Sequence, residues 1–128
     1  MIGTWGDWAN NVNHRGYFAR GEMVRNTSAV TGACCMIRPS VYRQVGGADP
    51  ALRVAYNDVD LCLRIRRAGY EIVYTPYAEL YHHEGSTRKD YQHQEDAPVF
   101  RDRWDPRRVL DPYYSPVFSD AVPFEIAG

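Results

Sequence analysis

The stretch Asn57-Asp58-Val59-Asp60-Leu61 opens a predicted helix, and His82-His83-Glu84-Gly85-Ser86 follows after that helix and one predicted strand. The first stretch places a carboxylate at the N-terminus of a helix, and the second places an imidazole at the end of a strand. Both are positions where a fold can hold reactive groups outside its core. The two stretches therefore outline a candidate active site, with Asp58 and His82 as its first members.

The helix is predicted to begin with Asn57 as its N-cap and to end at Gly69. Its inward-facing positions are apolar: Val59, Cys62, Leu63 and Ile65. Basic residues suit its negative C-terminal end: Arg64, Arg66 and Arg67. Because acidic residues flank these arginines and no RNA-binding motif accompanies them, we interpret them as a solvated helix face rather than a nucleic-acid patch.

Two elements are predicted before this helix. Residues 29–37 form a run of small and apolar residues, which predicts a strand buried on both faces. Gly32 within this run would allow a backbone or a ligand to come close. Pro39 suits the first turn of a short helix, and Gly46-Gly47 supplies its left-handed end.

The chain after the helix returns to the second motif. Residues 71–75 predict a strand, and residues 78–81 carry the chain back to His82. Residues 88–103 are polar and predict a surface helix, and repeated Pro dipeptides predict an extended tail beyond it. The predicted organisation is an irregular N-terminal arm, a central unit that holds both motifs, and a surface helix with a tail: residues 1–28, 29–88 and 89–128.

Composition sets the class of protein. The chain has 128 residues, of which 45% are hydrophobic, enough for one folded domain with a core. A net charge of -1 gives no general basic field, so nucleic acid is not an expected partner. Three cysteines make no disulfide framework, which favours a reducing cytoplasm. No apolar run reaches the roughly 20 residues of a membrane helix, although docking at the inner face of a membrane remains compatible with the sequence.

The ordered series of motifs resembles the C-terminal half of family 2 glycosyltransferases, most of all bacterial enzymes that extend surface polysaccharides. The wider family more often has Glu where Asn57 stands, but the following Asp is intact. The motifs are Thr31-Gly32-Ala33-Cys34, Gly46-Gly47-Ala48-Asp49, residues 57–64 with Ala68-Gly69-Tyr70, residues 75–83, and Asp111-Pro112-Tyr113-Tyr114.

The resemblance implies an α/β fold of the GT-A type, present here as a partial, acceptor-side half with a mixed sheet and an extended C-terminal tail. It also implies a nucleotide-sugar donor, a glycan acceptor, a divalent metal such as Mg²⁺ or Mn²⁺, and inversion at the anomeric carbon. In that scheme Asp58 matches the general base, and His82 matches the histidine that reaches the metal and the diphosphate. Residues expected to contact substrate are Asn57, Gly32, Ser86, Thr87 and Arg88. Asp60 is expected to be structural, and His83 to face away from the site.

The N-terminal half that holds the nucleotide in such enzymes has no counterpart before Gly32. We therefore expect the chain to be inactive alone, and the face that the other half would cover could drive self-association.

Three other interpretations remain open from the residues themselves. Asp58 could serve only to favour the helix N-terminus. A hydrolase that uses Asp58 and His82 as acid and base lacks a recognisable nucleophile motif. A non-enzymatic metal-binding or interaction domain could use the cysteines with His14, His82, His83 and His93, although their spacing matches no structural zinc site.

Overall fold

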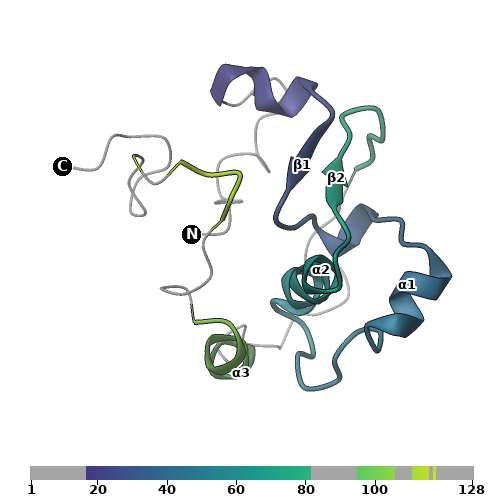
Figure 1. The fold of residues 1–128 in the computed structure, drawn as a ribbon, viewed down its shortest axis with the longest axis vertical. Helices are drawn as coiled ribbons and strands as arrows, with labels where there is room; N and C mark the ends of the chain where they lie inside the picture. The colour runs from purple at the N-terminus through teal and green to yellow at the C-terminus, as the bar shows by residue number, and fades with distance from the viewer. Residues whose placement is uncertain (1–16, 82–94, 106–110, 116, 118–128) are drawn as a thin grey trace.

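The computed structural model describes residues 17–81, 95–105, 111–115 and 117. Within these ranges the chain forms two strands, three α-helices and two 3-10 helices (Figure 1). In chain order they are η1 (Tyr17–Glu22), β1 (Arg25–Thr27), η2 (Gly32–Cys34), α1 (Pro39–Gln44), α2 (Asn57–Arg67), β2 (Ile72–Tyr74) and α3 (Asp96–Arg103). No helix within these ranges is long and apolar enough to cross a membrane.

The described sheet consists of β1 and β2, which pair antiparallel with Asn26 opposite Val73. The prediction of a strand near residues 71–75 is confirmed by β2. The prediction of a mixed sheet is wrong for the described residues, because they contain only this antiparallel pair. The N-terminal arm is also less irregular than predicted, since η1 and β1 both lie within it.

Residues 29–37 do not form the buried strand that their composition predicts. The segment contains η2, and its residues from Gly32 to Met36 are exposed. Local hydrogen bonds explain the difference, because Thr31 Oγ1 accepts from the amide of Ala33 and so caps the turn. An apolar run makes a buried strand only where neighbouring strands pair with it, and the described part of the chain offers none here.

The two helices around residues 39–67 were predicted well. Helix α1 begins at Pro39, and Gly46 and Gly47 after it have φ values of 81° and 71°. Helix α2 ends before Gly69, whose φ is 89°. The predicted N-cap is wrong by one residue, because Tyr56 holds that position with a left-handed backbone and Asn57 is the first helical residue.

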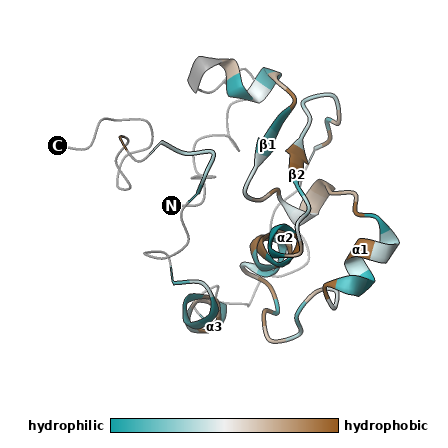
Figure 2. Ribbon diagram, in the orientation of Figure 1, coloured by the Kyte–Doolittle hydropathy of each residue, from teal (hydrophilic) through white to brown (hydrophobic). Residues whose placement is uncertain are grey.

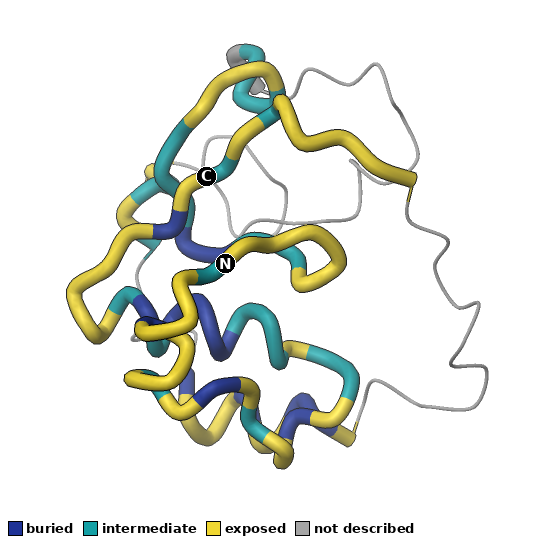
Figure 3. The backbone as a smooth tube through the Cα atoms, turned by 90° about the vertical axis from the view of Figure 1, so that its right-hand side faces the viewer, coloured by how far each residue is buried: buried dark blue, intermediate teal, exposed yellow. Residues whose placement is uncertain are grey.

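Helix α2 lies at the centre of the described fold, with a hydrophobic cluster on each side. Figure 2 shows hydrophobic residues on β2 and α1 and a mixture on α2. Buried residues occur in short segments in Figure 3, while much of the described chain is exposed. One cluster joins α2 to α1 and β2: Ala29, Val41, Leu61, Cys62, Ile65 and Ile72. The other joins α2 to α3: Leu52, Leu63, Phe100 and Trp104.

Helix α3 differs from the predicted surface helix. It is described only from Asp96, and Asp96, Ala97 and Phe100 are buried against the rest of the protein. Its apolar content is low, so its packing depends on a few side chains. Buried Phe100 contributes about 1.5–3 kcal/mol by the usual transfer of such a side chain from water.

The segment around Asp111 is not the free extended tail that its prolines suggest. Asp111 Oδ1 accepts a hydrogen bond from Ser28 Oγ at 2.6 Å, and Arg20 donates to the carbonyl of Tyr113 at 3.2 Å. The Arg66 guanidinium lies over the Tyr113 ring. These contacts therefore fix the segment against η1, the residue after β1, and α2, which a proline-based prediction cannot reveal.

Candidate active site

Asp58 stands in the first turn of α2, where its half-buried carboxylate is held on both oxygens. Oδ1 accepts from the amide of Val59 at 2.8 Å, and Oδ2 accepts from the amide of Gly32 at 2.9 Å. Helix N-termini favour negative charge, so this position suits an ionised carboxylate. The two bonds join α2 to η2 and fix the direction in which the carboxylate points.

Gly32 packs closely against the Asp58 side chain. A Cβ built on Gly32 would lie 3.3 Å from the Cβ of Asp58, tighter than an ordinary van der Waals contact. The predicted close approach at Gly32 is therefore made by the Asp58 side chain. Asn57 is half-buried beside them, so the structure brings together three of the predicted site residues. A role for Gly32 or Asn57 in binding substrate stays a prediction.

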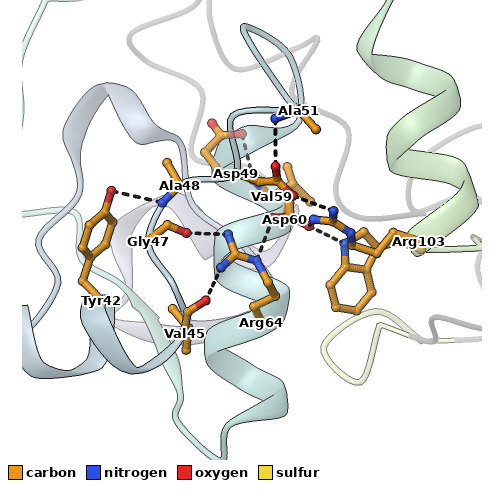
Figure 4. Close-up of polar contacts among 12 residues, drawn as sticks. Tyr42, Val45, Gly47, Ala48, Asp49, Ala51, Val59, Asp60, Arg64 and Arg103 are labelled. Carbon is orange, nitrogen blue, oxygen red and sulfur yellow. Dashed lines mark hydrogen bonds and ion pairs between the residues drawn. The ribbon is translucent and has the colours of Figure 1, made fainter.

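Asp60, two residues after Asp58 in α2, is fully buried and accepts hydrogen bonds from three side chains (Figure 4). Its Oδ2 accepts from Arg64 Nε at 2.8 Å, and its Oδ1 accepts from Arg103 Nη1 at 2.7 Å and Trp104 Nε1 at 2.8 Å. Burial alone would raise the pKa of this carboxyl, but the hydrogen bonds from Trp104, Arg103 and Arg64 outweigh burial and hold the pKa below its ordinary value of 3.8. The position is structural, as the sequence suggested.

The arginines of α2 do not form the solvated helix face that we predicted. Arg64 also donates to the carbonyls of Val45 and Gly47, at 2.5 and 2.7 Å (Figure 4). Arg66 donates to Ser28 Oγ at 2.9 Å, and the Arg67 guanidinium lies 4.0 Å from the centre of the Trp104 ring. These side chains therefore join α2 to the loops before it and to Trp104.

Residues 54–56 form the end of the loop before α2, and side chains of α3 contact them. Asp96 is 2% exposed, and its Oδ2 accepts from the amides of both Val54 and Ala55 at 2.8 Å. The rings of Tyr56 and Phe100 stack with centroids 4.8 Å apart. Sequence reasoning missed these residues, because Asp96 and Phe100 lie about forty positions after the loop and carry no motif of their own.

The second motif lies outside the described residues, and with it His82, His83, Ser86, Thr87 and Arg88. The sequence predicts a break in the strand at Pro76, and β2 indeed ends before it, at Tyr74. Residues 78–81 are exposed and form no strand, so the chain does not reach His82 along a continuation of β2. Pro76 explains the break, since proline has no amide to donate to a sheet ladder.

Within residues 17–81, 95–105, 111–115 and 117, no three His, Cys, Asp or Glu side chains are grouped closely enough to hold a metal ion. Cys34 and Cys35 are exposed free thiols, and Cys62 is buried in α2. Burial raises the pKa of the Cys62 thiol. The remaining residues considered for a metal-binding domain, His14 and His93, lie outside the described ranges.

Comparisons with known proteins agree on the kind of protein. The sequence profile of a family described as "Glycosyltransferase like family 2" matches residues 7–100. The chain is 41% identical over 111 residues, 80% of its length, to the uncharacterized protein y4gI of Sinorhizobium fredii, of which the match covers 12%. It is 34% identical over 107 residues, 77% of its length, to the O-antigen biosynthesis protein RfbC of Myxococcus xanthus, of which the match covers 8%.

A third relative is the N-acetylglucosaminyl-diphospho-decaprenol L-rhamnosyltransferase of Mycobacterium tuberculosis, 42% identical over 62 residues, which are 48% of this chain and 20% of that protein. The chain thus spans a fifth or less of the length of these relatives. No solved structure matches it significantly. The family implies the GT-A fold of nucleotide-sugar transferases, and the small α/β arrangement is consistent with part of such a domain. The chain belongs to the glycosyltransferase-like family 2.

Proposed function

We propose that Asp58 is the general base of a sugar transfer from a nucleotide-sugar donor to a glycan acceptor, with inversion at the anomeric carbon. The observation that carries the proposal is the geometry of Asp58, a half-buried carboxylate oriented by the amides of Gly32 and Val59 at the start of α2. An ionised carboxylate offers about four lone-pair positions, and these two amides use two of them. Capacity remains to accept a proton from an acceptor hydroxyl.

The proposed reaction needs only one base. The acceptor oxygen forms a bond to the anomeric carbon while its proton passes to Asp58, and the bond from the anomeric carbon to the diphosphate oxygen breaks. The nucleoside diphosphate leaves with the bonding electron pair. An alcohol is a poor nucleophile at neutral pH, and a positioned base accelerates such a step by about 10²–10⁴-fold. A direct displacement on the opposite face gives inversion.

The chemical class of the substrates rests on the relatives. One is named for O-antigen biosynthesis and another as a rhamnosyltransferase, so we infer that the acceptor is a growing bacterial surface glycan. Proteins of this family generally use a divalent metal. The described residues contain no cluster of three His, Cys, Asp or Glu side chains that could hold one. His82 as its ligand, Ser86, Thr87 and Arg88 as substrate contacts, and a cytoplasmic site at the inner membrane face stay predictions.

The test is the variant Asp58→Asn in the longest natural protein that contains this chain. An amide oxygen can still accept from Gly32, so the fold should survive while the base is lost. We expect kcat to fall by about 10²–10⁴-fold, with nucleotide-sugar binding, measured by calorimetry, unchanged. Glu71→Gln is the matched control, because Glu71 is an exposed carboxylate beyond the end of α2. A loss of less than tenfold for Asp58→Asn would remove Asp58 from the role of base.

The 128-residue chain by itself allows a second test. We expect it to form no product with nucleotide-sugar and acceptor, because neither the described residues nor the motifs supply a complete donor pocket. Product formation by the purified chain, sensitive to Asp58→Asn, would contradict this expectation and leave the role of Asp58 in place.

A further inference from the structure

The backbone at Tyr56 is in a conformation that side chains other than glycine rarely adopt. Its φ of 61° and ψ of -1° lie in the left-handed region, where a Cβ crowds the following carbonyl. Tyr56 stands immediately before α2 and two positions before Asp58. Strained backbone persists only where the surroundings impose it, and such strain is concentrated at functional sites.

Two side chains of α3, Asp96 and Phe100, contact residues 54–56 and can hold the strained backbone in place. Asp96 Oδ2 holds the amides of Val54 and Ala55, the two residues before Tyr56, and the Phe100 ring stacks on the Tyr56 ring at an interplanar angle of 19°. Asp96 and Phe100 are four positions apart and so lie on one face of α3. Both are buried. Helix α3 therefore contacts three consecutive residues of the segment, 54–56.

The backbone conformation of Tyr56 sets the direction of the first turn of α2. The Tyr56 carbonyl accepts from the amide of Asp60 at 2.8 Å, which is the first hydrogen bond of the helix. Asp58 lies inside the turn that this bond closes. Rotation of the Tyr56 backbone out of the left-handed region would redirect that turn and move the Asp58 carboxylate away from Gly32, whose amide donates to Oδ2 at 2.9 Å.

We propose that Asp96 and Phe100 are positioning residues that hold residues 54–56 in the strained conformation which directs Asp58 toward Gly32. This inference rests on the proposed role of Asp58 as base, and it names the residues outside the motif that would set the direction of that base. A purely structural α3 would stabilise the fold in the same way as any packed helix, with no particular effect on the contact between Asp58 and Gly32.

Hydrogen exchange of the Gly32 amide and the ¹³C shift of the Asp58 carboxyl, both by NMR of the 128-residue chain, report the contact without any need for activity. Asp58→Ala defines complete loss of the bond. We expect Phe100→Leu and Asp96→Ala to raise Gly32 exchange by up to about fivefold, the factor that corresponds to an ordinary hydrogen bond, and to shift the Asp58 carboxyl signal. Val41→Ala is the control, because Val41 is buried in α1 and belongs to the hydrophobic cluster that does not contain Phe100.

Variants at Tyr56 separate the ring from the backbone and remain useful if an α3 variant fails to fold. Tyr56→Phe keeps the stack and should exchange like the natural chain. Tyr56→Ala loses the stack but not the strain and should exchange faster, whereas Tyr56→Gly adopts the left-handed backbone without strain and should fall between them.

Equal Gly32 exchange in Phe100→Leu, Tyr56→Ala and Val41→Ala would overturn the positioning role and leave the proposed base untouched. Unchanged exchange in Asp58→Ala would show that the contact itself is absent in solution and would overturn it as well. Normal positioning together with full kcat in Asp58→Asn would instead contradict the proposed function alone.

Discussion

Replacing Asp60 with Asn tests the centre of the polar network that joins α2 to α3. The carboxylate is fully buried and accepts from Arg64, Arg103 and Trp104 at 2.7–2.8 Å. An Asn side chain has the same shape but one acceptor oxygen, so either Arg64 or the pair Arg103 and Trp104 faces an amide NH₂ instead. Hydrogen bonds to charged groups contribute about 1.5–3 kcal/mol each, and removing one partner of a buried pair costs about 3–5 kcal/mol.

The two arginines keep part of their contact with water, with side chains 20% and 34% exposed, which lowers this cost. We therefore expect Asp60→Asn to lower the free energy of unfolding by about 2–4 kcal/mol, a large share of the roughly 5–15 kcal/mol of a typical domain. Urea unfolding followed by circular dichroism measures it. With a slope of about 2 kcal/mol per molar urea, the midpoint should fall by about 1–2 M.

The loss should also depend on pH. The folded pKa of Asp60 lies below its ordinary value of 3.8, so its stabilisation is complete well above pH 3.8 and disappears as the pH falls through the folded value. The gap between the natural chain and Asp60→Asn should therefore narrow below pH 3.8. Asp102→Asn, an exposed carboxylate on α3, should leave the midpoint unchanged. A loss below about 1 kcal/mol for Asp60→Asn at pH 7 would refute the reasoning, because the network would then resemble surface ion pairs.

Three further predictions concern other parts of the fold. Gly69→Ala should lower stability by about 1 kcal/mol in urea unfolding, because its φ is 89° although nothing lies within 4 Å of a built Cβ; an unchanged midpoint would contradict the left-handed helix end. Ser28→Ala should cost about 1–3 kcal/mol by the same measurement, since this 1% exposed hydroxyl both donates and accepts, and a neutral result would show that the tail contact is not formed. A chromogenic thiol reagent at pH 8 should label exposed Cys34 and Cys35 rapidly and Cys62 only after unfolding, with rapid labelling of all three as the contrary outcome.

Local signals in the sequence predicted the elements whose ends they mark. Pro39 and Gly46 bracket α1, and Gly69 follows α2. The apolar spacing within α2 identified three buried residues, Cys62, Leu63 and Ile65, but it missed Leu61 and included the half-buried Val59. These features act within a few residues, so they can be read along the chain. The prediction of a buried strand at residues 29–37 was wrong, because the burial of a strand depends on neighbouring strands that composition alone does not reveal.

The candidate site was predictable only at its motif. Asp58 at the start of a helix followed from the pattern around it, but its contact with Gly32 joins residues 26 positions apart. The supports of Asp60 lie 43 and 44 positions away, at Arg103 and Trp104. Nothing in the polar composition of residues 88–103 predicts that two of them meet a buried carboxylate, because such pairing is decided by how α3 packs.

The anchoring of Asp60 by Arg103 and Trp104 decides where the domain can be cut. The family match ends at residue 100, before either of these side chains. A shortened chain that stopped there would leave a buried negative charge with Arg64 as its remaining side-chain donor and would expose the apolar surface that Trp104 covers. The folding unit therefore extends beyond the residues that the family profile matches, and expression of the domain should include at least residue 105.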